Sequence, residues 1–380
     1  MENAVVIYLF QLNNFKILCS KNKLFAYIYI GDIYMPCKKF VFFYAIFLIA
    51  IVFVVIGVSV KWDKELEIYE EKAQKVEEQE EVKKYEELLA NDTVRLKITS
   101  TGEIIELDMN EYLRGVVPSE MPPYYHIEAL KAQAIVARTY AYQKMETGGH
   151  NDCDLCDSAA HCQAYYSVEK ILQIWERRGF DEALRAQYLE NVNEAVYATN
   201  NTVVTYNGEL IRAYFHANSG GKTENVSAIW GKQYIPYLIA VESLGEENHD
   251  YYKTDVTLSK SELQTKLNNN TSIPCFITSS SGEVVDILSY TDSGRVDKVS
   301  IGGSIYDATQ LRTALGLKST NFTVDVKDGN ITFHVTGYGH GVGMSQTGAN
   351  YYGKEGYTAN EIIQHYYTGV DITRLNVMEE

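Results

Sequence analysis

Glu120 is the residue of this sequence best placed to do acid–base chemistry. It lies in the segment Ser119-Glu120-Met121-Pro122-Pro123, between a strand-like Val116-Val117 and an Ala-rich helix that begins near Ile127. The two prolines predict a turn, so the carboxylate is expected at the end of an element rather than on a solvated face. A serine or glutamate here could instead cap the helix or favour its dipole. From this stretch alone the capping interpretation is favoured.

The loop from His150 to Cys162 is a second candidate for chemistry. It carries two histidines and three cysteines within thirteen residues. Zinc takes four thiolate or imidazole ligands in a tetrahedron, and such a loop could close that site locally. Outside the cytoplasm, a disulfide such as Cys156 with Cys162 is the alternative. Cys153 leaves a third arrangement open, in which it chelates together with Cys156.

Two Gly-rich blocks follow, YFHANSGGKTEN from Tyr214 and GYGHGVGMSQTGAN from Gly337. Consecutive glycines let the backbone approach a ligand closely, although the first block lacks the GxxxxGK[ST] pattern of a P-loop. The second block has too many glycines for a helix and suits a tight loop that walls a site. His340 in that loop could contact a substrate or be hydrogen-bonded within the loop.

The stretch around Glu120 and these two blocks, in this order, resemble the stage II sporulation protein D family, membrane-bound lytic transglycosylases of endospore formers. The resemblance runs from about Val94 to the C-terminus, and three separate blocks argue against coincidence. It implies that Glu120 is the catalytic acid, with Lys222 as the foremost substrate contact. The full set of substrate contacts that we carry over is Arg138, Tyr214, His216, Ser219, Lys222, His340, Ser345 and Gln346.

Clostridial members of this family hold a structural zinc through the spacing His-x5-Cys-x4-His-Cys. His150, Cys156, His161 and Cys162 match that spacing residue by residue. The resemblance therefore favours zinc over a disulfide, with Cys153 as an extra thiol. Four protein ligands leave no open coordination position, so we expect the ion to brace the loop rather than activate water.

The resemblance also implies a mechanism with a single carboxylate. Ordinary glycosidases need two, whereas in a lytic transglycosylase the 6-hydroxyl of the sugar attacks C1. Glu120 would first act as acid and then as base, leaving a 1,6-anhydromuramoyl end. Burial beside Val117, Met121 and Pro122 would keep the carboxyl group protonated near neutral pH. The three blocks offer no obvious second carboxylate, which agrees with this mechanism.

The expected substrate is glycan already stripped of its peptides, cleaved between mother-cell and forespore membranes during engulfment. The expected partners are stage II sporulation proteins P, an amidase, and M, a membrane scaffold. The rival function is a non-catalytic peptidoglycan-binding protein that recruits or enhances an amidase, because relatives include amidase enhancers. A zinc hydrolase is a third possibility, disfavoured by the closed ligand set.

The N-terminal part predicts a membrane anchor. Residues 40–60 carry no charge and are long enough to cross a bilayer as a helix, while Lys38 and Lys39 before them place the N-terminus in the cytoplasm. Met35 resembles a natural start, so residues 1–34 would not be translated. Residues 61–92 are rich in Glu, Lys and Gln and predict an acidic helical stalk.

The remaining chain predicts an α+β fold. We expect a mixed catalytic domain at 93–242 and 336–380 and a smaller strand-rich subdomain at 243–335, behind a cytoplasmic segment at 1–39. A formal charge of −16 argues against nucleic-acid binding, which needs a basic face. The 30 tyrosines, against 3 tryptophans and 13 phenylalanines, offer flat apolar faces with a hydroxyl, which could stack on sugars or pack a core.

Overall fold

The computed structural model describes residues 7–12, 15–20, 26–30, 33–36, 92–231, 233–277 and 284–375. The chain forms two compact units, Met1–Val82 and Lys83–Glu380. The predicted membrane helix at 40–60 and the predicted stalk up to residue 91 lie outside the described residues. Among the residues that are described, no helix combines the length and apolar character needed to cross a membrane.

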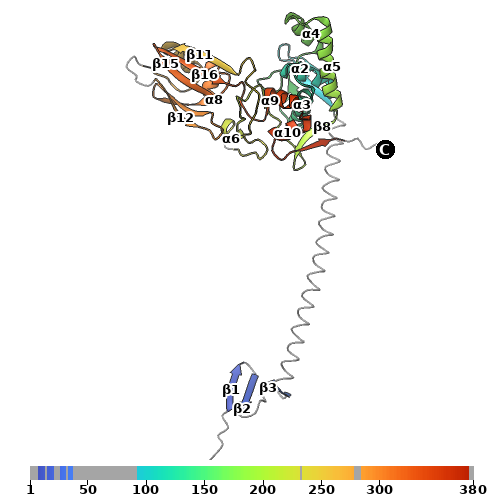
Figure 1. Ribbon diagram of the computed structural model, residues 1–380, viewed down its shortest axis with the longest axis vertical. Coiled ribbons are helices and arrows are strands. Elements are labelled where there is room, and N and C mark those ends of the chain that lie inside the picture. The colour runs from blue at the N-terminus through green and yellow to red at the C-terminus, as the bar shows by residue number, and fades with distance from the viewer. Residues whose placement is uncertain are drawn as a thin grey trace, which may run out of the picture. The chain divides into compact units, whose positions relative to one another are not determined.

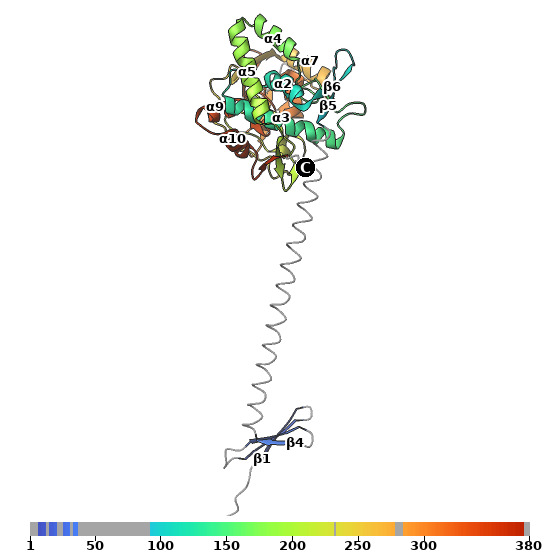
Figure 2. The same ribbon diagram turned by 90° about the vertical axis from the view of Figure 1, so that its right-hand side faces the viewer.

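The first unit contains a four-stranded antiparallel sheet in the order β1-β2-β3-β4 (Figure 2). Its strands are β1 Ile7–Leu12, β2 Phe15–Ser20, β3 Ala26–Ile30 and β4 Ile33–Pro36. The hypothesis that translation begins at Met35 stays a prediction.

The second unit mixes helices and strands, as the sequence predicted. Its helices are α2 Met109–Glu120, α3 Ile127–Thr147, α4 Val168–Arg177, α5 Glu182–Ala198, α6 Val226–Ile229, α7 Lys260–Asn270, α8 Ala308–Leu315, α9 Gln346–Lys354 and α10 Ala359–Tyr366. Its strands are β5 Thr93–Lys97, β6 Ile104–Asp108, β7 Leu155–Cys156, β8 Thr202–Tyr206, β9 Glu209–Leu210, β10 Phe215–His216, β11 Lys253–Ser259, β12 Val285–Tyr290, β13 Val296–Ile301, β14 Ser304–Asp307, β15 Phe322–Lys327, β16 Asn330–Thr336, β17 Met344–Ser345 and β18 Asp371–Arg374.

Helix α3 forms the centre of the larger hydrophobic core. Every residue from Leu130 to Tyr142 except Lys131 is buried, so this helix has no broad polar face. Its alanines let α2, α5, α9, α10 and β8 all pack against it (Figure 1). The side chain of His126 caps its start, and Gly148 ends it in the left-handed conformation with φ 68°.

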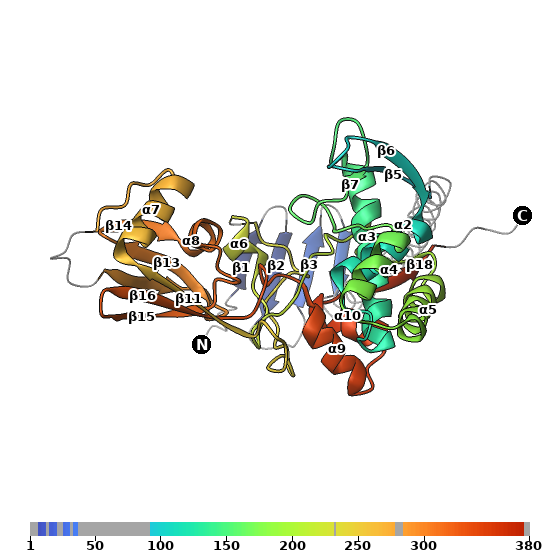
Figure 3. The ribbon, with the colours of Figure 1, turned by 90° about the horizontal axis from the view of Figure 1, so that it is seen from above.

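A second hydrophobic cluster extends from Leu258 to Val335. It is enclosed by the sheets β11-β16-β15 and β12-β13-β14 with α7 and α8, which form a group of their own in Figure 3. Residues 83–380 nevertheless form one compact unit, and the predicted subdomain boundaries at 243 and 335 stay a prediction.

Two hairpins and one helix differ in how their local sequence specifies them. The chain forms the hairpins β5-β6 and β8-β9, and Asn207 and Gly208 take positive φ at the turn of the second. Val116-Val117 is not strand-like, because it lies inside α2 and both residues face the core. Gly179, with φ 85°, lies between α4 and α5, and Asp181 caps the start of α5.

Candidate functional site

Glu120 lines a pocket of about 410 Å³. One wall is the segment from Pro118 to Pro123 together with Tyr125 and one side of α4, and the other wall comes from loops of the later chain. The lining residues are Pro118, Ser119, Glu120, Met121, Pro122, Pro123, Tyr125, Tyr166, Ile171, Ile174, Trp175, Arg178, Ala217, His249, Tyr251, Tyr338 and Gln346. Glu120 supplies the one carboxylate among these described residues. The pocket has the concave form and aromatic lining of a ligand site.

Glu120 is held at the end of α2 rather than in a free turn. It is the last residue of the helix, and Met121 leaves the helix in an extended conformation. Ser119 donates its hydroxyl to the Gly115 carbonyl, and His126 caps α3, so neither Ser119 nor Glu120 caps the following helix. The capping interpretation of Glu120 is therefore wrong.

The backbone N–H of Ala164 donates to Oε1 of Glu120 at 2.6 Å. This bond fixes one carboxyl oxygen and leaves Oε2 as the oxygen without a backbone donor. Burial raises the pKa of Glu120 to about 7, and the Ala164 hydrogen bond opposes that rise. Desolvation penalises the charged form, so the carboxyl group is substantially protonated near neutral pH.

Gly115 lets the segment that carries Ala164 reach α2. A Cβ at this position would lie 2.2 Å from the ring of Tyr165 and 2.6 Å from the carbonyl oxygen of Tyr166. Real Cβ atoms do not approach other atoms so closely, so a larger residue would push this segment away. The absence of a side chain at Gly115 thus supports the contact between Ala164 and Glu120.

The four residues with the zinc-ligand spacing lie together. Their ligand atoms are all within 4.8 Å of one another, and Cys153 is not part of the group. The measured contacts are 3.2 Å between His150 Nε2 and Cys162 Sγ, 3.4 Å between His161 Nδ1 and Cys162 Sγ, and 3.9 Å between His161 Nδ1 and Cys156 Sγ. Zinc–ligand bonds of about 2.0–2.3 Å at a tetrahedral angle put N and S about 3.6 Å apart, so the donor set fits zinc.

The loop that carries these ligands is anchored to the first hairpin. Strand β7 pairs with β5 in parallel, with Cys156 opposite Lys97. Lys97 also forms an ion pair with Asp152 at 2.7 Å, and the backbone N–H of Thr99 donates to Asp157 at 2.9 Å. Cys162 precedes Ala164 by two residues, so whatever fixes this cluster also fixes the donor to Glu120.

The predicted substrate contacts do not form one group. Gln346 lines the Glu120 pocket, and its amide donates to Gln133 at 3.2 Å. Arg138 is fully buried and donates to the carbonyls of Val196 and Thr199, so its guanidinium links α3 to α5 and is not in the pocket lining. Lys222 is exposed and is also absent from that lining.

Tyr214 and His340 contact a residue that the sequence reasoning missed, Trp230, and His216 packs against His340. The Trp230 ring lies 4.7 Å from that of Tyr214 and 4.9 Å from that of His340, centroid to centroid, and Trp230 is 49% exposed. Burial lowers the pKa of His340 to about 3 and that of His216 well below its ordinary value. Both imidazoles are therefore neutral at physiological pH. The backbone N–H of Val342 donates to His340, a hydrogen bond within the Gly-rich loop.

Glu246 is the second residue that sequence reasoning missed. Its side chain is buried and accepts hydrogen bonds from three separate segments. The donors are the hydroxyls of Ser219, Ser243 and Ser345 and the backbone N–H groups of Gly220 and Gly221. The predicted contacts Ser219 and Ser345 thus bind Glu246, within the protein. No signal in the sequence marked this glutamate, because four of its five donors lie 25 or more residues away along the chain.

The pocket aromatics were also missed individually. Trp175 and Arg178 lie at the end of α4, and His249, Tyr251 and Tyr338 face them from the later loops. The high tyrosine count was the one signal of an aromatic lining in the sequence, and it did not indicate which tyrosines line the pocket.

The part of the chain that carries Glu120 and the Cys/His cluster matches a known protein family. The family model described as "Stage II sporulation protein" matches residues 97–206, which include Glu120 and the Cys/His cluster. The stage II sporulation protein D of Bacillus amyloliquefaciens is 35% identical over 278 residues, covering 72% of this chain and 77% of that protein. That of Bacillus subtilis (strain 168) is 34% identical over the same shares.

The chain belongs to the stage II sporulation protein D family. Membership implies a role in sporulation. The amidase enhancer of Bacillus subtilis (strain 168) is also similar, 29% identical over 311 residues that cover 69% of this chain and 40% of that protein. The family resemblance predicted from three short blocks is confirmed.

Replacing Glu246 tests the junction of the three loops. We expect Glu246→Ala to lower the free energy of unfolding by at least about 3 kcal/mol, because buried donors lose their acceptor. Glu246→Gln should lower the free energy of unfolding by less, because a serine hydroxyl can rotate to accept a hydrogen bond from the glutamine NH₂ group. Urea unfolding of the full chain measures this, with the exposed neighbour Glu247→Ala as control, expected within about 0.5 kcal/mol of wild type. An equal loss in both alanine variants would contradict the assignment.

Replacing Glu120 by glutamine tests its raised pKa. The folded chain keeps the Glu120 proton up to pH about 7, whereas the unfolded chain loses it near pH 4.5, so stability falls as pH rises between these values. Glu120→Gln removes that cost and should stabilise the chain at pH 8 by up to about 3 kcal/mol. At pH 4 the gain should vanish. Denaturant unfolding at both pH values checks this, and a gain independent of pH would contradict it.

Proposed function

We propose that this protein is a lytic transglycosylase that cleaves peptide-stripped peptidoglycan glycan. The observation that carries the proposal is the side chain of Glu120, whose pKa is about 7. Among the described residues that line the pocket, Glu120 is the one acidic residue. A general acid is most effective when its pKa lies near the working pH. Ordinary glycoside hydrolysis needs a second carboxylate, whereas internal attack by a sugar hydroxyl does not.

In the proposed reaction, Glu120 donates its proton to the glycosidic oxygen that leaves C1 of N-acetylmuramic acid, and that oxygen takes the electron pair of the broken C1–O bond. The 6-hydroxyl oxygen of the same sugar forms the new bond to C1. Its proton passes to the Glu120 carboxylate, which restores the acid. No water is consumed. Because Ala164 holds Oε1, Oε2 is the oxygen free to exchange the proton with the sugar.

Other residues would orient the glycan and exclude water. The rings of Tyr125 and Tyr166 offer faces on which sugars can stack. Arg178 is exposed and supplies donors at the rim, whereas Gln346 is buried in the lining. Of the substrate contacts predicted from the sequence, Gln346 lines the pocket. Tyr214 and His340 with Trp230 would form an aromatic surface outside the pocket lining, with the buried His216 packed against His340.

We further propose that His150, Cys156, His161 and Cys162 hold a structural zinc ion, as their mutual distances support. Bound there, zinc would supply cross-linking of the loop and no Lewis-acid chemistry on the substrate, because all four positions are taken by protein ligands. The consequence for this chain lies in Ala164, whose N–H would be held in place for Glu120. The same ligand count argues against a zinc hydrolase.

The proposed setting follows the family. The chain would be anchored in the mother-cell membrane through residues 40–60, with its C-terminal unit outside the cytoplasm, facing the space around the forespore. It would act during engulfment with stage II sporulation proteins P, the amidase that strips the peptides, and M, a membrane scaffold.

A second candidate function is peptidoglycan binding without catalysis, in which the chain recruits or enhances an amidase. The similarity to the Bacillus subtilis amidase enhancer supports it. The pocket and its aromatic lining would serve either function, and the raised pKa of Glu120 favours the catalytic one.

Mass spectrometry of reaction products distinguishes these functions. Peptide-stripped glycan is incubated with the purified full chain, wild type beside Glu120→Ala and Glu120→Gln. We expect 1,6-anhydromuramoyl ends with wild type and a loss of at least about 1,000-fold in both variants, since the proton donor is removed. Reducing ends that depend on Glu120 would indicate hydrolysis and a missed second carboxylate. Intact glycan that is bound by wild type and variants alike would favour the binding function.

Metal analysis tests the zinc proposal independently of activity. We expect one zinc ion per purified chain, lost in Cys162→Ser, and a lower melting temperature after chelation, because metal binding is coupled to folding of the loop. Cys153→Ser is the matched control, since Cys153 lies outside the ligand group and should keep the metal. A metal-free wild type whose mass is two hydrogens lower than the reduced form would instead establish a disulfide.

A further inference from the structure

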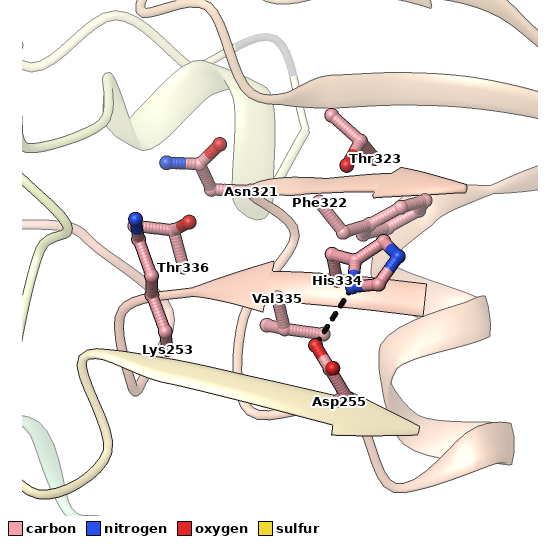
Figure 4. Close-up of a pocket in the computed structure, with 8 residues that line it drawn as sticks. All are labelled: Lys253, Asp255, Asn321, Phe322, Thr323, His334, Val335 and Thr336. Atoms are coloured by element: carbon pink, nitrogen blue, oxygen red, sulfur yellow. Dashed lines mark hydrogen bonds and ion pairs between the residues drawn. The ribbon is translucent and has the colours of Figure 1, made fainter. Parts of the chain in front are cut away.

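A second cavity, of about 630 Å³, lies on the sheet β11-β16-β15, outside the Glu120 pocket (Figure 4). Its polar side chains are on the outer face of the sheet, in cross-strand rows in which Lys253 pairs with Thr336, Asp255 with His334, and His334 with Thr323. The inner face of the same strands carries Phe333, Ile331 and other apolar residues of the second core. An antiparallel sheet with one buried face normally has such a polar, solvated outer face. The residue types on this outer face therefore do not by themselves indicate a function.

The position of this cavity relative to Glu120 is the informative feature. Tyr251 lines the Glu120 pocket, and Lys253, two residues later, lines the second cavity. The same holds for Tyr338, which lines the Glu120 pocket, and Thr336 at the end of β16, which lines the second cavity. Two residues of chain span at most about 7 Å, so the two cavities adjoin along two adjacent chain segments. The backbone N–H of Gly337 donates to the Tyr252 carbonyl and joins these segments between the cavities.

Aromatic rings and a lysine lie at the passage from one cavity to the other. The rings of Tyr251 and Tyr338 meet edge to face with centroids 5.5 Å apart. The ammonium group of Lys318 lies 4.4 Å from the Tyr338 centroid and 5.1 Å from that of Tyr251, and these cation–π contacts hold both rings in place. Tyr251 is 48% exposed, so an aromatic face remains open to a ligand.

The chemistry of the second cavity suits an uncharged polyhydroxylated chain. Lys253 and Asp255 have opposite charges, and His334 hydrogen-bonds Asp255 at 2.8 Å and Asp325 at 3.3 Å. Neither charge dominates, which disfavours nucleic acid or an anionic lipid surface. Asn321, Thr323 and Thr336 add neutral donors and acceptors. Sugar hydroxyl and acetamido groups are the ligands that use such a mixed set.

We propose that this cavity, one part of the outer face of the sheet β11-β16-β15, is a distal subsite that binds further sugars of the glycan strand whose bond is cut at Glu120. This proposal rests on the proposed function, because its ligand is the glycan that the proposed function assigns to the protein. The strand would leave the Glu120 pocket over Tyr251 and Tyr338 and continue between Lys253 and His334. Such a subsite makes the protein prefer long strands and leaves the binding of a single repeat unit unchanged.

Binding of short and long glycans tests the proposal. The full chain carries Glu120→Gln to prevent turnover, and its affinity is measured by calorimetry for peptide-stripped glycan of one repeat unit and of several. We expect the long glycan to bind at least about tenfold more tightly, the equivalent of one or two net hydrogen bonds. Adding Lys253→Ala and His334→Ala should abolish that advantage and leave the affinity for the single repeat unchanged.

Lys327→Ala is the matched control. Lys327 is exposed on β15 of the same sheet and is absent from the cavity lining, so its loss should leave the preference for long glycan intact. Equal affinity for short and long glycan, or a preference that survives the double substitution, overturns the distal subsite and leaves the proposed function standing. Failure of glycan of any length to bind, together with no cleavage by wild type, overturns both.

Discussion

The buried carboxylate of Glu246 is the interaction on which the arrangement of the later loops depends. Glycine-rich loops have little apolar surface of their own, and their backbone groups must find partners when buried. Glu246 supplies five acceptor contacts to segments near 219–221, 243 and 345. From these segments the chain continues directly to Ala217 and Gln346, which line the pocket opposite Glu120. The Glu246 side chain thus joins the segments that supply this wall.

The opposite wall depends on an approach of two backbones. The lack of a side chain at Gly115 lets the segment at 164–166 pack against α2, and Ala164 then donates to Glu120. The Cys/His cluster lies just before this segment along the chain. A carboxyl group that is buried but keeps one strong donor has a moderately raised pKa, rather than one too high to release a proton. The local architecture therefore accounts for the acid that the proposed reaction needs.

The two hydrophobic clusters meet through polar rather than apolar contacts. Arg295, buried beside the second core, donates to the carbonyls of Ser219 and Lys222, while Thr291 and Ser293 donate to Glu224. The SGGKTE block is consequently a junction between the cores. This explains why a block rich in polar residues contributes none of the described residues that line the Glu120 pocket.

The sequence by itself determined the family, the α+β class, the central helix from near Ile127 and the candidate acid, because these follow from local pattern and from short blocks of residues. It also determined the Cys/His spacing, since ligands within thirteen residues can meet without the rest of the fold. Tertiary structure alone decided the surroundings of each residue. Arg138 binds carbonyls about sixty residues away, Glu120 binds Ala164 at a separation of 44, and Glu246 reaches Ser345 at 99. Burial and hydrogen-bond partners arise from such distant contacts, and they separate a residue that contacts a ligand from one that holds the protein together.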